Sequence, residues 1–221
     1  MVLAANCSSP SVISPSGSVR PASTRDAPAI SRSMTSAFYD DPGFVWCIPD
    51  SAARKKQLPA FFRIVFESLV GFGHCYCAAD SAAASMWVPP GREPLTGEQS
   101  ALLRAVFESV GAVATARFSG LIELMASHHP DQDHAYLWLL GVSTPGQNRG
   151  LGSTLLRSGL DLCDERSLPA YLEATTDRNR RLYERHGFHV TGELTANGSP
   201  PMWAMWREPL NRAPTRSTRQ K

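Results

Sequence analysis

The chain has 221 residues, of which 43% are hydrophobic and 19% are charged, and its formal net charge is +2 at pH 7. This length and composition indicate one globular domain and exclude an intrinsically disordered chain. A net charge so close to zero gives no reason to expect nucleic acid or a membrane as a partner, and no apolar run approaches the ~20 residues of a membrane span.

Both ends of the chain differ in composition from its middle. Serine, proline and small residues dominate residues 1–16, which we expect to be disordered, and no signal peptide is recognised there. Residues 209–221 form a basic tail that we also expect to be disordered, so the domain is predicted to span residues 17–208. The odd number of cysteines indicates reduced, mostly buried thiols in a cytoplasmic protein. These cysteines are Cys7, Cys47, Cys75, Cys77 and Cys163.

The first half of the domain is predicted to contain a short strand, two helices, a pair of strands, and then one or two further helices. In chain order these elements cover residues 18–22, 26–38, 51–70, 73–79, 82–88 and 97–128. Residues 40–43, with the sequence Asp-Asp-Pro-Gly, are expected to form a turn. A break or bend in the last helical region is predicted near Ser119 and Gly120.

The second half alternates strands and helices and ends in a strand pair. Its predicted elements are strand 134–142, helix 151–166, strand 169–174, helix 177–186 and strands 188–195 and 202–207. Asn197 and Gly198 signal a hairpin, although Pro200 and Pro201 favour a loop of more than two residues. The order of elements predicts an α/β fold with a twisted mixed sheet and helices on both faces.

A glycine-rich loop joins the strand that ends at Val142 to the next helix. The first amides of such a helix lack intrahelical partners, and its dipole adds partial positive charge there. Gly150 and Gly152 leave this backbone accessible, which favours binding of a phosphate or pyrophosphate. Leu155 stands where a Rossmann loop needs its third glycine, and no lysine separates Gly152 from Ser153 as in a Walker A loop.

A second group of residues follows on the helix predicted at 177–186. Asn179 and Tyr183 are four residues apart, so both project from one face of that helix. Thr176 or Asp177 can cap its start, and Gly187 can end it. This spacing places one amide and one phenol on the same helix face.

The two motifs together resemble a known family. Gln147-x-x-Gly150-x-Gly152 and Asn179-x-x-x-Tyr183-x-x-x-Gly187-Phe188 are similar to the coenzyme-binding segments of the GNAT superfamily of N-acetyltransferases. The resemblance extends from about residue 18 to residue 208, and residues 37–42, 140–142, 172–175 and 188–190 look like the branch that contains puromycin N-acetyltransferase. It implies the GNAT fold and a transferase that moves an acetyl group from acetyl-CoA to a primary amine by direct attack in a ternary complex.

The resemblance also implies roles for individual residues. Acetyl-CoA would be bound by Leu140, Val142, Gln147, Asn148, Arg149, Gly150, Leu151, Gly152, Ser153 and Asn179. Tyr183 would protonate the departing thiolate. Glu173, at a strand end beside the coenzyme groove, is either the general base or a carboxylate in a structural hydrogen-bond network.

No metal is expected, because the histidines are not at metal-ligand spacing. His128 and His129 precede Pro130 at a helix end, where an imidazole can meet the last carbonyls, and His134 is expected to be exposed or to act as a cap.

The sequence does not identify the amine acceptor. Aromatic walls with one or two acids suit a cationic amine that has an apolar body, although each tryptophan is equally a candidate core residue. The candidate specificity residues are Tyr39, Asp40, Asp41, Trp46, Trp87 and Trp203. The expected partner is a small-molecule amine, such as a puromycin-like aminonucleoside, a polyamine or an aryl amine, with peptide N-termini as a further option and a homodimer as a candidate assembly. Two other functions remain open: a catalytically silent acyl-CoA-binding sensor and a transferase of a longer acyl group.

Overall fold

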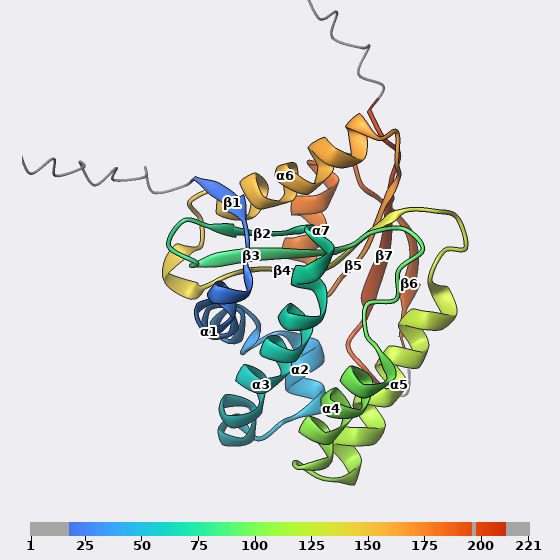
Figure 1. Cartoon of the computed structure of the whole chain (residues 1–221). Coiled ribbons are helices and arrows are strands. Elements are labelled where there is room, and N and C mark those ends of the chain that lie inside the picture. Colours follow the sequence, from blue (N-terminus) through green and yellow to red (C-terminus); the bar gives the residue numbers. More distant parts are fainter. Residues whose placement is uncertain (1–17, 196–197, 211–221) are drawn as a thin grey trace, which may run out of the picture.

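The computed structural model describes residues 18–195 and 198–210. It confirms the predicted single α/β domain, with a mixed sheet and helices on both of its faces (Figure 1). The predicted disordered segment 1–16, Asn197 of the predicted hairpin and residues 211–221 of the predicted tail lie outside the described residues.

In the part of the chain that the structure describes, the strands form one sheet in the order β1-β2-β3-β4-β5-β7-β6. They are β1 (Val19–Pro21), β2 (Cys75–Ala78), β3 (Ala83–Val88), β4 (Ala135–Val142), β5 (Ala170–Ala174), β6 (His189–Leu194) and β7 (Met202–Arg207). Neighbouring strands pair antiparallel, except that β4 and β5 are parallel. The parallel pair lies near the middle of the sheet, where both strands are flanked by others.

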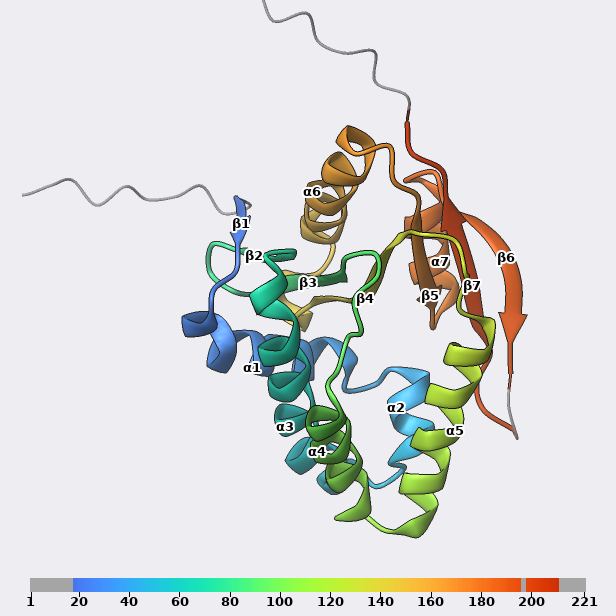
Figure 2. The same ribbon diagram turned by 45° about the vertical axis from the view of Figure 1, so that its right-hand side comes forward.

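The helices divide between the two faces of the sheet (Figure 2). They are α1 (Ala27–Phe38), α2 (Pro42–Cys47), α3 (Ser51–Leu69), α4 (Gly97–Glu108), α5 (Ala112–His128), α6 (Leu151–Glu165) and α7 (Asp177–Glu184). Helices α1 to α5 bury side chains such as Phe62 and Phe107 on one face, and α6 and α7 bury Leu156 and Tyr183 on the other. None of the described helices combines the length and the apolar character needed to cross a membrane.

Two details of the helices differ from the sequence prediction. Helix α2 begins within the predicted turn, because the Asp41 side chain accepts a hydrogen bond from Gly43 N at 2.9 Å and Pro42 suits the first helical position. The break between α4 and α5 lies at Gly111, whose φ of +141° favours glycine, whereas Ser119 and Gly120 lie inside α5. The predicted break near those two residues was therefore wrong.

Strands β4 and β5 diverge soon after they begin. They pair only at Ala135 with Ala170 and at Tyr136 with Tyr171. Beyond that point β4 continues to Val142 along β3, while β5 continues along β7. The facing edges of β4 and β5 therefore separate into a wedge, and the backbone of β4 on that side carries no strand partner.

Candidate active site

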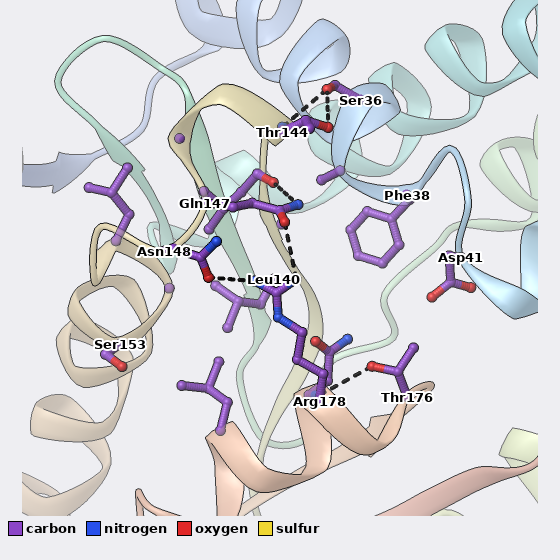
Figure 3. Close-up of a pocket in the computed structure, with 18 of the residues that line it drawn as sticks. Ser36, Phe38, Asp41, Leu140, Thr144, Gln147, Asn148, Ser153, Thr176 and Arg178 are labelled. Atoms are coloured by element: carbon purple, nitrogen blue, oxygen red, sulfur yellow. Dashed lines mark hydrogen bonds between the residues drawn. The ribbon is translucent and has the colours of Figure 1, made fainter.

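The wedge opens into a cleft of about 540 Å³, lined by the ends of α1 and β4, the loop that follows β4, the start of α6, and α7 (Figure 3). Most of the residues predicted to bind the coenzyme line it. These are Leu140, Val142, Gln147, Asn148, Gly150, Leu151, Gly152, Ser153 and Asn179, together with Tyr183. Arg149 is exposed and does not line the cleft. Glu173 lies outside it and lines an adjoining pocket instead.

The start of α6 has the properties of an anion-binding site. Gly150 precedes the helix with φ of +78°, a conformation that favours glycine, and Thr154 N makes a helical hydrogen bond to Gly150 O at 3.0 Å. The amides of Leu151 to Ser153 come before this bond and so lack intrahelical acceptors. A Cβ at Gly152 would lie 3.7 Å from both Val142 and Leu182, so any larger side chain would extend between the walls of the cleft. The site therefore fits a diphosphate.

Arg178, on α7, forms hydrogen bonds with the loop that precedes α6. Its guanidinium donates hydrogen bonds to Gln147 Oε1 at 3.2 Å and to Asn148 Oδ1 at 3.0 Å (Figure 3). Gln147 Nε2 in turn donates to Val142 O at 3.2 Å. Arg178 also lines the cleft and brings a positive charge to it, whereas Arg149, which was predicted to bind the coenzyme, does not line it. Arg178 stands next to Asn179 in the sequence, which is a signal for a role near the cleft. Its contact with the loop before α6 is visible only in the folded structure.

A second pocket, of about 120 Å³, lies between the sheet and helices α2 and α5. Its walls are mostly apolar. They include Phe44, Phe61, Phe118, Leu121, Ile122, Met125, Trp138 and Met202. The pocket shares Phe38, Asp41, Leu140, Asn179 and Tyr183 with the larger cleft. The two pockets therefore border one another at these five side chains.

Tyr183 lies at this junction with only 6% of its surface exposed. Burial and the nearby Asp41 raise the pKa of its phenol well above the ordinary value, so the hydroxyl remains protonated at neutral pH. Asp41 accepts hydrogen bonds from Thr175 Oγ1 at 2.5 Å and from Gly43 N at 2.9 Å, and burial raises the pKa of its carboxyl. The junction thus offers a proton donor.

Glu173 projects from β5 into the second pocket. Its Oε2 accepts a hydrogen bond from Tyr136 Oη at 2.8 Å, and its buried Oε1 has no hydrogen-bond partner among the described residues. Burial raises the pKa of Glu173 to about 7, although the Tyr136 and Tyr171 hydroxyls partly oppose this shift. This carboxylate can therefore accept a proton near neutral pH, and it also belongs to a hydrogen-bond network.

Several aromatic residues predicted for the acceptor site line neither pocket. Tyr39 donates to Ser51 O, Trp46 and Trp203 stack under Arg117 and Arg180, and Trp87 is buried against Gly159 of α6. Asp41 lines both pockets, and Asp40 lines the cleft. Trp138 and the apolar face of α5 form the walls instead, and sequence reasoning missed both because these residues also fit a core pattern.

The histidines lie away from both pockets. The prediction that His134 is exposed or acts as a cap was wrong: it is 7% exposed and packs against Tyr171 and Trp206, with its Nε2 3.1 Å from His129 Nε2. His128 Nδ1 lies 2.9 Å from Leu124 O at the end of α5, as predicted for a helix end. Within the described residues, His, Cys, Asp and Glu side chains nowhere gather in threes as a metal site requires.

Comparison with known proteins identifies the family. The model of the acetyltransferase (GNAT) family matches residues 32–188, which is more than half of the chain. An uncharacterized N-acetyltransferase of Schizosaccharomyces pombe is 26% identical over 199 residues, which cover 84% of this chain and 81% of that protein.

Solved structures agree with this match. One from Corynebacterium glutamicum, described as histone acetyltransferase HPA2 and related acetyltransferase, has a TM-score of 0.68 and 28% identity, and the match covers 88% of this chain and 97% of that one. A polyamine N-acetyltransferase of Drosophila melanogaster, at 15% identity, shares the fold with a TM-score of 0.59, covering 86% and 99% of the two chains. The chain therefore belongs to the GNAT family of acetyltransferases, and it is an acyltransferase.

Proposed function

We propose that the protein transfers an acetyl group from acetyl-CoA to the primary amine of a small molecule, by direct attack in a ternary complex. The observation that carries this proposal is the meeting of two pockets at Tyr183. One pocket contains a helix start suited to a diphosphate, and the other contains a carboxylate that can accept a proton near neutral pH. The membership of the branch around puromycin N-acetyltransferase stays a prediction.

The cleft contains groups that would bind the pyrophosphate, the pantetheine and the thioester of acetyl-CoA. The amides of Leu151, Gly152 and Ser153 would bind the pyrophosphate, with Arg178 adding positive charge. The edge of β4 that faces β5 carries no strand partner at Leu140 and Val142, so its backbone would pair with the pantetheine amides. A backbone amide at or beside Val142 would polarise the thioester carbonyl.

The proposed chemistry uses one residue from each side of the junction. Glu173, directly or through water, removes a proton from the ammonium form of the acceptor, and the amine nitrogen then attacks the thioester carbon. The new C–N bond forms and the C–S bond breaks. Tyr183 donates a hydrogen bond to the sulfur as negative charge develops there and protonates the thiolate, and the proton that the attacking nitrogen loses as the amide forms replaces the Tyr183 proton, directly or through water.

Gly152→Val tests the coenzyme site. We expect it to weaken acetyl-CoA binding by about tenfold or more, measured by titration calorimetry, because the side chain would extend between Val142 and Leu182, where the diphosphate would bind. Gly152→Ala is the matched control, since its methyl group makes only ordinary contacts at 3.7 Å. Unchanged affinity in the valine variant would contradict the assignment.

Arg178→Gln tests the loop contact. We expect acetyl-CoA affinity to fall about 3- to 30-fold, because the loop loses two hydrogen bonds and the cleft loses a positive charge. Arg181→Gln is the control, as Arg181 is exposed on the same helix and does not line the cleft. Equal losses in the two variants would show that only the net charge of α7 matters.

A free-thiol assay separates the proposal from its alternatives. Turnover of an amine panel with acetyl-CoA supports the transferase. Tight acetyl-CoA binding without turnover of any amine would favour a sensor, and faster turnover with propionyl-CoA or succinyl-CoA would favour a longer acyl group.

A further inference from the structure

We propose that the acceptor is a primary amine with a single positive charge and a compact apolar body of about one ring, such as an arylalkylamine. This inference deepens the proposed function and rests on it. It follows from what lines the second pocket and from a fully buried polar atom there, Glu173 Oε1, that has no hydrogen-bond partner among the described residues.

The polar groups of the second pocket are few, and most lie toward the junction. Asp41 and Asn179 line both pockets, and Thr175 is bonded to Asp41. Away from the junction the wall is formed by α5 and by the aromatic side chains of α2 and α3. A second ammonium group placed against that wall would meet only apolar side chains and would gain no polar partner there. The wall therefore disfavours diamines and polyamines.

Glu173 provides one site for a cation. Its Oε1 is buried and accepts no hydrogen bond among the described residues, although the Tyr171 hydroxyl lies near the carboxylate, whereas its Oε2 already accepts from Tyr136. Leaving a buried acceptor unpaired is costly, so a ligand that donates an N–H to Oε1 gains this hydrogen bond on binding. The Asp41 carboxylate already accepts from Thr175 and Gly43, so it offers less to a second cation. A single fully buried carboxylate oxygen without a partner, in a mostly apolar pocket, suits a monocation.

The volume of the second pocket suits an acceptor whose apolar part is about the size of one ring. Its volume of about 120 Å³ is close to that of a cavity of roughly 150 Å³ lined by Leu, Ile and Phe that holds benzene. Peptide N-termini would bring further amide groups into this apolar space, and each would need a hydrogen-bond partner there. One aromatic ring on a short linker meets both the size and the polarity of the pocket.

The experiment compares amines on the full chain in the free-thiol assay. We expect kcat/KM for 2-phenylethylamine to exceed that for putrescine and for a short peptide with a free N-terminus by about tenfold or more. Equal or faster turnover of putrescine or of the peptide would overturn the inference and leave the proposed function standing. Turnover of no amine, despite acetyl-CoA binding, would overturn both.

A variant of the pocket wall provides a second test of the preference for monoamines. Ile122 lines the pocket from α5 and is 38% exposed, so Ile122→Glu can place a carboxylate at the wall without burying it fully. We expect the ratio of kcat/KM for putrescine to that for 2-phenylethylamine to rise about tenfold, because the second ammonium gains a partner. Val113→Glu on the same helix is the control, since Val113 is 65% exposed and does not line the pocket. An unchanged ratio in Ile122→Glu, with the fold retained by circular dichroism, would count against the inference.

Discussion

Tyr183→Phe is expected to lower kcat by about 100-fold or more, while the Kd for acetyl-CoA stays close to that of the unaltered protein. The phenol lies where the two pockets meet, and burial together with Asp41 keeps it protonated. Phenylalanine retains the ring that packs against Phe188 and removes only the hydroxyl, so the thiolate would lose its hydrogen-bond donor as it departs. The loss should therefore appear in the chemical step.

Single-turnover release of free thiol, with calorimetry of acetyl-CoA binding alongside it, measures this effect. Tyr39→Phe is the matched control, because its hydroxyl donates to Ser51 O and it lines neither pocket. If Tyr183→Phe raised KM and left kcat unchanged, the hydroxyl would contribute to binding and not to proton transfer. Unchanged kcat and KM would remove Tyr183 from the mechanism.

The parts of the site that the sequence predicted are those carried by short, contiguous segments. Gly150 and Gly152 mark a strand-to-helix turn, and the four-residue spacing of Asn179 and Tyr183 places both side chains on one helix face. Backbone geometry alone brings each of these segments to its position. The structure places all four residues in the lining of one cleft.

The features that the sequence could not reveal depend on contacts between distant segments. Arg178 reaches a loop about 30 residues earlier in the chain, and Trp87 is buried because α6 approaches β3 at Gly159. Apolar patterning has the same appearance for a pocket wall and for a core, so Trp138 and Trp87 could not be told apart. The burial of His134 likewise depends on Tyr171 and Trp206, which lie on other strands.

The second large effect is expected at Glu173. Glu173→Gln should lower kcat/KM at neutral pH by about 100-fold, because glutamine has nearly the same shape but cannot accept the proton of the ammonium. In the unaltered protein, kcat/KM should show an inflection near the pKa of about 7, with activity rising as pH increases and the carboxyl becomes ionised. The glutamine variant should lose this inflection, and an inflection that persists there would assign it to another group.

Tyr136→Phe tests the direction of the same titration. The Tyr136 hydroxyl donates to Glu173 Oε2 at 2.8 Å and so stabilises the ionised carboxylate, which lowers its pKa against the opposing effect of burial. Without that hydrogen bond the pKa of Glu173 should rise, and the inflection in kcat/KM should move to higher pH, while activity well above the inflection is largely retained. A purely structural role for Tyr136 would lower activity equally at every pH. Tyr39→Phe should leave the profile in place, and a shift to lower pH in Tyr136→Phe would exclude Glu173 as the base that Tyr136 tunes.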